Sequence, residues 1–401
     1  MHILLDVTRL VSRIGQSQLT GVDRVERAYL DFALGLPRPL FFYRSTRGYV
    51  LLGAEGGRAL ARFADGADLP ARGDILSHLI WRGRHPRHRL QAALRKFALA
   101  RCPHFTGLSR MISAHVPSEA VYLNVGHANL SPAVFEAVQP RKVLVYVHDV
   151  IPLTHPQFTR AGISARFEQK LSQVGRYADA ILTNSNVSKQ AICDWFYPNP
   201  SPPCHVLYPG LDHAKNLPLP RNPQRRFLMI GTIEPRKNHA LLLDTWDALF
   251  AEMGPDDCPE LHLVGQRGWA APDLLQRLDQ HLLRNTKIFE HGALPDAELR
   301  DLMQSANALL FPSLAEGFGY PPLEALQVGL PCIVSDLPVH REVLKTYAIF
   351  LSPLDPQAWK TQIKEILLSG SSGLASPMDD LPNWKDHFRA VQAVISDDVR
   401  E

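Results

Sequence analysis

Residues 311–326 decide the fold, and their sequence is FPSLAEGFGYPPLEAL. The apolar run at 308–311 predicts a strand, which is followed by a turn with two glycines and by prolines that favour the first positions of a helix. A strand, a turn and a helix in this order leave free backbone N–H groups at the carboxyl edge of a parallel sheet, where such sheets bind ligands. Glu316 lies in the turn and Glu324 in the helix, separated by seven residues. Two carboxylates can therefore accept hydrogen bonds from hydroxyl groups of one ligand.

The rest of the chain continues this alternation, which is typical of a parallel sheet covered by helices. Apolar runs predict strands at 143–147, 180–183, 227–231, 261–265, 308–311 and 332–335, and apolar spacings of three and four predict helices at 162–177, 186–196, 239–251, 272–283, 296–304, 322–328 and 384–395. A chain of 401 residues is too long for one ordinary core, and the proline-rich stretch at 197–225 predicts a linker. We expect an N-terminal domain over 1–210 and a C-terminal domain over 225–370, with a last helix at 384–399 that packs back on the first domain.

Residues 231–238 read GTIEPRKN and predict a strand, a loop and a helix start that carries Arg236 and Lys237. Together with the spacing of Glu316 and Glu324, this element resembles the retaining glycosyltransferases of the GT4 family (glycosyl transferases group 1), which have the GT-B fold. The resemblance implies an α/β protein in which two Rossmann-like, doubly wound domains face each other across a cleft. It also implies that Arg236, Lys237 and Glu316 are catalytic, because a departing nucleoside diphosphate carries negative charge that a guanidinium, an ammonium and a helix N-terminus stabilise. We expect the two cations at an exposed loop edge.

Residues 148–153 read HDVIPL and follow the strand predicted at 143–147. They are similar to an element found in a subset of GT4 enzymes, many of them bacterial mannosyl- or rhamnosyltransferases of polysaccharide biosynthesis, which implies that His148 or Asp149 contacts a sugar hydroxyl as part of the catalytic site. In the first strand–helix loop, Asp23 stands where the family's G-x-G-R pattern has a second glycine, and it can cap the following helix instead. By resemblance the donor-binding residues are Gly21, Arg24, Gly231, Thr232, Gly317, Phe318, Gly319, Tyr320, Glu324 and His291.

The resemblance implies a hexosyltransferase that moves mannose or a similar hexose from a nucleotide sugar, with GDP-mannose as the best candidate. The acceptor would be a saccharide or lipid-linked saccharide in bacterial surface polysaccharide synthesis. No Asp-x-Asp tripeptide is present, so we expect no metal site, with Arg236 and Lys237 doing the work of a cation; the nucleotide sugar is a substrate, and no cofactor is expected. Two alternatives stay open, namely another enzyme of the same fold, such as an epimerase or a phosphorylase, and a catalytically silent sugar-nucleotide-binding protein.

Residues 81–101 carry seven Lys or Arg side chains and no Asp or Glu. The apolar spacing from Leu90 to Ala98 predicts an amphipathic cationic helix over 89–102, which either contacts an anionic membrane or forms a solvated basic face of the first domain. A net charge of +3 does not indicate a nucleic-acid partner. No stretch approaches the roughly 20 apolar residues that span a bilayer, and the first residues are unlike a signal peptide. We therefore expect a cytoplasmic protein, or one peripheral to the inner membrane.

Overall fold

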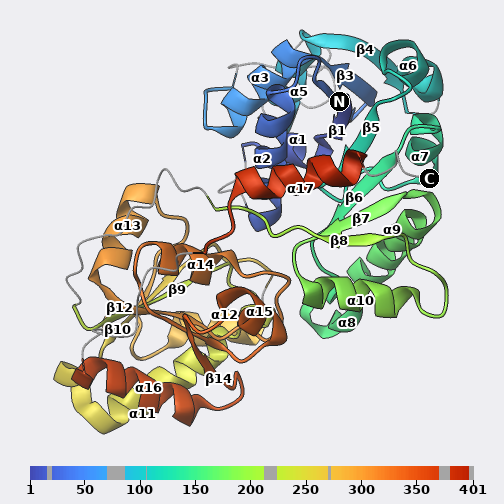
Figure 1. The fold of residues 1–401 in the computed structure, drawn as a ribbon. Helices are drawn as coiled ribbons and strands as arrows, with labels where there is room; N and C mark the ends of the chain where they lie inside the picture. The colour runs from blue at the N-terminus through green and yellow to red at the C-terminus, as the bar shows by residue number, and fades with distance from the viewer. Residues whose placement is uncertain are drawn as a thin grey trace.

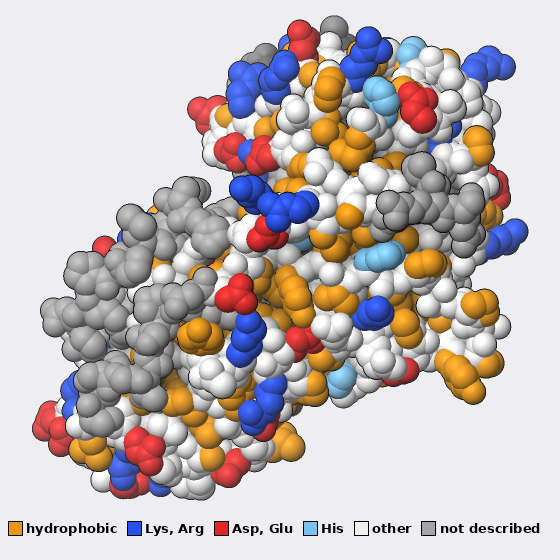
Figure 2. Space-filling model, viewed as in Figure 1, with side chains coloured by type: hydrophobic (Ala, Val, Ile, Leu, Met, Phe, Trp, Pro, Cys, Tyr) orange, Lys and Arg blue, Asp and Glu red, His pale blue; other side chains and the backbone are white. Residues whose placement is uncertain are grey.

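The computed structural model describes residues 1–15, 20–69, 86–104, 106–211, 224–269, 272–369 and 380–396. In this part the chain forms two sheets, one in each of two lobes (Figure 1). The face shown in Figure 2 carries Lys and Arg side chains interspersed with Asp and Glu over both lobes.

The N-terminal sheet has eight strands in the order β4-β3-β2-β1-β5-β6-β7-β8. Pairing is parallel from β2 through β1 and β5 to β8, so these strands end at one edge of the sheet, whereas β2, β3 and β4 pair antiparallel. The strands are β1 Ile3–Asp6, β2 Leu40–Ser45, β3 Gly48–Leu52, β4 Ala98–Pro103, β5 Val121–Asn124, β6 Val143–Val147, β7 Ala180–Thr183 and β8 Cys204–Val206. The helices of this lobe are α1 Thr8–Arg13, α2 Gly21–Leu34, α3 Ala54–Ala64, α5 Pro86–Arg95, α6 Leu108–His115, α7 Pro132–Val138, α8 Ile151–Thr154, α9 Ile163–Tyr177 and α10 Asn186–Phe196, with a 3-10 turn η1 at Pro156–Phe158.

The C-terminal sheet has six parallel strands in the order β11-β10-β9-β12-β13-β14. Its strands are β9 Arg226–Ile230, β10 Glu260–Val264, β11 Ile288–Glu290, β12 Ala306–Phe311, β13 Cys332–Ser335 and β14 Ile349–Leu351. Its helices are α11 His239–Asp257, α12 Pro272–Gln280, α13 Asp296–Ser305, α14 Tyr320–Gln327, α15 Pro338–Leu344 and α16 Pro356–Ser369, with a 3-10 turn η3 at Pro235–Lys237.

Both sheets are covered on both faces, because neighbouring strand residues point into different apolar clusters. In β1, Leu4 and Leu5 belong to two separate buried clusters, and in β9 the same holds for Leu228 and Met229. The inner strands β6 and β12 are buried along their whole length, as expected for parallel strands between two helix layers. The prediction of two doubly wound α/β units is therefore confirmed.

The last described helix, α17 Trp384–Ser396, returns from the C-terminal lobe and packs against α2 of the N-terminal lobe (Figure 1, red). Phe388 stacks on Phe32 with ring centroids 4.3 Å apart. His387 is buried between Tyr29, whose hydroxyl lies 2.9 Å from Nε2, and the carbonyl of Tyr208, 3.0 Å from Nδ1. The N-terminal core is thus completed by the end of the chain.

The prediction of one helix over 89–102 is wrong. Helix α5 ends at Arg95, and β4 begins at Ala98 and pairs antiparallel with β3. Leu90 and Leu94 have no exposed surface and belong to the N-terminal core, so the apolar side of α5 faces the domain and not a membrane. Residues 81–85 of the basic run lie outside the described residues.

The bounds of other elements differ from the predicted ones by smaller amounts. The predicted linker at 197–225 contains β8, whose pairing with β7 is set by tertiary contact and not by its own sequence pattern. The helix predicted at 272–283 ends at Gln280, and an extra helix, α1, interrupts the first strand–helix loop.

No helix within the described ranges is long and apolar enough to cross a bilayer.

Candidate active site

The loop after β9 delivers Arg236 and Lys237 to the carboxyl edge of the C-terminal sheet. Pro235 opens the 3-10 turn η3, and Asn238 ends it with φ 58° and ψ 43°, a left-handed conformation that asparagine tolerates better than most residues. This reversal lets α11 begin at the next residue. The carbonyl of Arg236 accepts the N–H of Leu314 at 2.8 Å, which ties the loop to the turn after β12.

Glu316 binds both cations. Its Oε1 lies 2.5 Å from Lys237 Nζ, and its Oε2 lies 2.6 Å from an Arg236 nitrogen. Arg236 also contacts Glu234 at 2.8 Å, and Lys237 Nζ lies 4.4 Å from the centre of the Phe311 ring. The structure therefore brings together the three residues that the sequence predicts as the charged centre of the site.

Charge and burial act against each other in this cluster. Burial alone would raise the pKa of Glu316, but the charges of Arg236 and Lys237 hold that pKa well below its usual range. Burial also opposes the charged form of Arg236, yet Glu316, Glu234 and Asp149 keep its pKa above its ordinary value. Burial lowers the pKa of Lys237 against the attraction of Glu316. The expectation of an exposed loop edge is wrong for Lys237, which is only 8% exposed.

His148 and Asp149 lie at the carboxyl end of β6, opposite this cluster. His148 Nε2 donates to the carbonyl of Val125 at 2.8 Å, and Asp149 Oδ1 accepts the N–H of Ile151 at 3.0 Å. Burial lowers the pKa of His148 to about 4, so its ring is neutral at neutral pH. A Cβ added to Gly317 would lie 2.8 Å from both the His148 carbonyl oxygen and Asp149 Cβ. The turn after β12 thus meets the loop after β6 at Gly317.

A second contact between the lobes joins α2 to α14. Arg24 pairs with Glu324, and its guanidinium carbon lies 4.8 Å from the centre of the Tyr320 ring. A Cβ added to Gly21 would lie 3.2 Å from Cδ2 of the same ring. These four residues, predicted to bind the donor, lie together where the lobes meet.

Asp23 completes the start of α2. Its Oδ2 accepts the backbone N–H of Thr20 at 2.9 Å and the hydroxyl of Thr20 at 2.7 Å, and its Oδ1 lies 2.7 Å from Arg9 Nε. The interpretation of Asp23 as a helix-capping residue is confirmed, and the residue has no exposed surface.

The remaining predicted donor-binding residues lie around the carboxyl edge of the C-terminal sheet. Gly319 has φ 92° and precedes the first residue of α14, a conformation that favours glycine. Phe318 is buried with its ring centre 5.4 Å from that of Tyr320. Gly231 lies against the Lys237 side chain, and Thr232 lies against Gly268.

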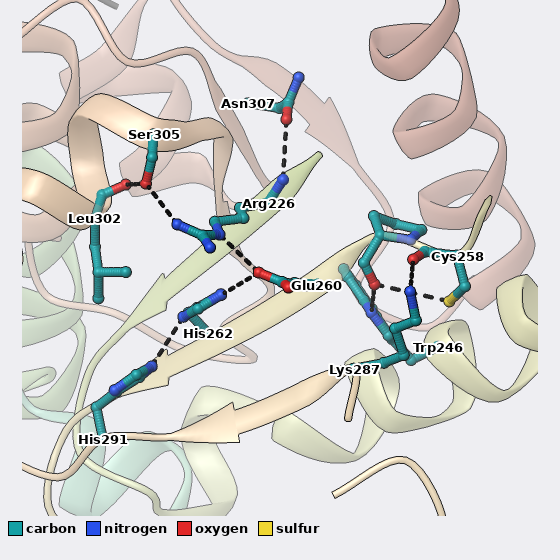
Figure 3. A network of polar contacts seen from close by, with 11 residues as sticks. Arg226, Trp246, Cys258, Glu260, His262, Lys287, His291, Leu302, Ser305 and Asn307 are labelled. Atoms are coloured by element: carbon teal, nitrogen blue, oxygen red, sulfur yellow. Dashed lines mark hydrogen bonds and ion pairs between the residues drawn. The ribbon is translucent and has the colours of Figure 1, made fainter. Parts of the chain in front are cut away.

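His291 directly follows β11 at this edge, and its side chain belongs to a polar network separate from the charged cluster (Figure 3). Its Nε2 lies 2.9 Å from Nδ1 of His262, and His262 leads through Glu260 to Arg226 and Ser305. His291 also lines a hollow of about 520 Å³ beside α13.

Sequence reasoning missed Ser185, Ser188, His340 and Glu342. Ser185 and Ser188 contact the Gly317 carbonyl, and Glu342 binds the first turn of α10. His340 is buried within reach of Gly319, with Nδ1 2.7 Å from the carbonyl of Ser335. The serine before residue 186 is an N-cap signal, but nothing local in the sequence places it beside residue 317.

Residues 214–376 match the family described as glycosyl transferases group 1. The chain is 32% identical over 257 residues to the serotype-specific mannosyltransferase WbdA of Escherichia coli, a match that covers 59% of this chain and 31% of that protein. It is 31% identical over 229 residues to the O-antigen chain mannosyltransferase RfbU of Salmonella typhimurium, covering 56% of this chain and 61% of that protein. The chain thus spans about a third of WbdA and about three fifths of RfbU.

The fold is also similar to that of solved structures. Alr3699/HepE of Anabaena, in complex with UDP and glucose, superposes with a TM-score of 0.66 at 15% identity, covering 99% of this chain and 100% of that chain. TarM superposes with a TM-score of 0.60 at 11% identity, covering 76% of this chain and 60% of that chain. The predicted resemblance to group 1 glycosyltransferases and to bacterial mannosyltransferases is confirmed, as is the GT-B type of fold.

Proposed function

We propose that this protein is a retaining mannosyltransferase, because residues 214–376 match the glycosyl transferases group 1 family and the chain has the GT-B fold. It transfers a mannosyl group from a nucleotide sugar to a saccharide or a lipid-linked saccharide in the synthesis of a bacterial surface polysaccharide. WbdA and RfbU, whose names describe mannosyltransferases, support the choice of sugar. GDP-mannose is the donor that we propose.

One observation carries the proposal, namely the group of Arg236, Lys237 and Glu316 at the carboxyl edge of the C-terminal sheet. Two cations beside a helix start suit the negative charge of a diphosphate, and a buried carboxylate beside them suits the hydroxyl groups of a sugar. Asp149 and the backbone carbonyl of His148 face the same place from the other lobe, where an acceptor would enter. The arrangement provides polar partners for a donor and an acceptor at one point.

The reaction proposed here takes place on one face of the sugar. The bond from the anomeric carbon to the phosphate oxygen breaks, a bond from the same carbon to the acceptor oxygen forms, and the acceptor's proton passes to the departing phosphate. Arg236 and Lys237 stabilise the charge that develops on that phosphate, which is the kind of contribution that is stronger in the transition state than in the ground state. Glu316 and the backbone of Gly317 and Gly319 position the sugar. This positioning reduces the loss of entropy that is needed to reach the transition state.

The binding of donors tests the proposed substrate. Thermal unfolding is measured with GDP-, UDP-, dTDP- and ADP-sugars, because a ligand at 100 times its Kd adds about 2.7 kcal/mol to the free energy of unfolding. We expect GDP-mannose to raise Tm most. A larger rise with a UDP-sugar alone would replace the proposed donor without changing the proposed class of reaction.

Product analysis separates the proposal from its rivals. A transferase releases free nucleoside diphosphate only as sugar appears on the acceptor, an epimerase converts the donor without releasing it, and a binding protein does neither. Release of GDP from GDP-mannose that depends on an added mannosyl acceptor is the expected result. Conversion of the donor to an isomer would contradict the proposal.

A further inference from the structure

The first turn of α10 lies at the contact between the lobes, against α15. Ser185 caps it, because its Oγ accepts the N–H of Ser188 at 3.0 Å. Two other N–H groups of this turn bind a side chain of the opposite lobe: Glu342 accepts the N–H of Asn186 at 2.6 Å through Oε1 and that of Val187 at 3.0 Å through Oε2. A carboxylate is favoured at a helix N-terminus, where N–H groups lack partners within the helix. Glu342 of α15 therefore completes the capping of a helix in the other domain.

The same helix end holds the turn that carries Glu316. Ser185 Oγ donates to the carbonyl of Gly317 at 3.0 Å, and Ser188 Oγ lies 3.4 Å from the same oxygen. Gly317 directly follows Glu316, whose carboxylate binds Lys237. Ser185 is completely buried. The backbone position of the charged turn therefore depends on a helix of the N-terminal lobe.

Two more contacts surround Glu342. The hydroxyl of Tyr208, in the segment after β8, donates to Glu342 Oε1 at 2.8 Å, and Asn186 Nδ2 lies 3.1 Å from the same oxygen. Val187 packs against the buried core of the C-terminal lobe. Separating the lobes would leave a carboxylate, two N–H groups and the Gly317 carbonyl without these partners at once. We call these contacts together the α10 latch, namely those of Ser185 and Ser188 with the Gly317 carbonyl and those of Glu342 with the first turn of α10.

We propose that Ser185 and Glu342 are positioning residues for sugar transfer, because the α10 latch holds the turn at 316–319 in place when the two lobes are together. The proposal rests on the proposed function, in which Glu316 and the glycines of this turn orient the sugar. A contact that served only to pack the lobes would affect stability without affecting the order of the turn or the rate of transfer.

Hydrogen–deuterium exchange of the protein without ligand tests the structural part, independently of any activity. In Glu342→Ala we expect amides at 316–320 to exchange at least 10-fold faster than in the wild type, in addition to amides at 186–189. Asp336→Asn is the matched control, because it breaks an exposed pair with Arg341 beside α15 and leaves α10 untouched. Faster exchange at 186–189 alone, with the turn unchanged, would overturn the proposal.

Kinetics test the functional part. We expect Glu342→Ala and Ser185→Ala each to lower kcat/KM for transfer at least 10-fold relative to Asp336→Asn, and Glu342→Asp, which keeps the charge, to recover part of the loss. Ser185→Ala serves as the second variant if Glu342→Ala does not fold. Retention of kcat/KM within threefold in both alanine variants would contradict the positioning role. If the wild type transfers no sugar, the proposed function fails, and the exchange experiment still decides whether the latch orders the turn.

Discussion

Glu316 is the residue on which the charged site depends. Its carboxylate is 7% exposed and binds two cations from a different loop of the same domain. Without a ligand, Glu316 and Glu234 balance the charges of Arg236 and Lys237. These carboxylates hold the two cations in place before a diphosphate binds, so the cations themselves need little reorientation.

Removing one of the two cations tests its role in stabilising the leaving group. Lys237→Met and Arg236→Met keep most of the side-chain volume, and we expect each to lower kcat roughly 10²-fold, the effect of losing one stabiliser of transition-state charge. The rate is measured as acceptor-dependent release of nucleoside diphosphate, at a temperature where circular dichroism shows each variant folded. Lys364→Met, which removes an exposed lysine that pairs with Glu252, is the control. Rates near that of the wild type in both variants would contradict the assignment of Arg236 and Lys237 to the departing diphosphate.

Two glycines at the contact between the lobes differ in what surrounds them. In Gly317→Ala the new Cβ would lie 2.8 Å from the backbone oxygen of His148, whereas in Gly21→Ala it would lie 3.2 Å from the side chain of Tyr320, which can move. We therefore expect Gly317→Ala to lower kcat/KM at least 10-fold more than Gly21→Ala does. Equal effects of the two substitutions would show that the close approach at Gly317 is not required.

At the scale of elements, α17 is the helix with which the chain returns from the C-terminal to the N-terminal lobe, where it completes the core. The carbonyl of Pro382 accepts the N–H of Leu211 at 3.0 Å, so the two crossings between the lobes run side by side. His387 is the polar centre of the contact between α17 and α2, with both ring nitrogens hydrogen-bonded. The attachment of α17 should therefore depend on the protonation of His387.

The pH dependence of stability tests this attachment. Burial lowers the pKa of His387 from 6.5 to about 4 against its bond with the Tyr208 carbonyl, so between these pH values the unfolded state binds a proton that the folded state does not. Stability is therefore lost as the pH falls from about 6.5 to about 4, by up to roughly 3 kcal/mol from this residue. Between pH 7 and pH 5 we expect the Tm of the wild type to fall by more than the Tm of His387→Gln, because the glutamine side chain does not titrate. An identical loss in both proteins would contradict the assignment.

At the scale of the whole molecule, the basic side chains that we propose to bind the donor come from both lobes. Arg24 from α2 meets Glu324 and Tyr320 of α14, while Arg236 and Lys237 come from the loop after β9. The site is therefore assembled only when the lobes are in contact. This explains why no single segment of the chain contains it.

These fixed cations lead to a prediction about metal ions. Because Arg236 and Lys237 can neutralise the diphosphate, we expect acceptor-dependent release of nucleoside diphosphate to persist in excess EDTA at more than half the rate measured without it. The same assay with added Mg²⁺ or Mn²⁺ is the comparison. Loss of activity in EDTA that either ion restores would contradict the proposed role of the two side chains.

Local sequence was sufficient for six strands, namely β6, β7, β9, β10, β12 and β13, but it did not predict β1 to β5, β8, β11 or β14. The strands at 143–147, 180–183 and 332–335 have the predicted bounds, because an apolar run between turn residues is a signal that the chain carries locally. Arg236, Lys237 and Glu316 are predicted as one site from the resemblance to the GT4 family, and their place at the end of parallel strands agrees with that prediction. The prediction of a helix over 89–102 was wrong because, in a short window, its apolar spacing fits a helix and an edge strand equally well. Antiparallel pairing with β3 makes the segment after α5 a strand.

The sequence by itself thus determined the α/β class and the resemblance to group 1 glycosyltransferases, and that resemblance pointed to the residues of the charged centre. Only the tertiary structure decided how the lobes meet. Ser185 and Gly317 are 132 residues apart in sequence, and Asn186 and Glu342 are 156 apart. Nothing in a local pattern records such contacts, because each partner looks alone like an ordinary helix cap or a surface acid. They require both folded lobes, because each partner comes from a different lobe.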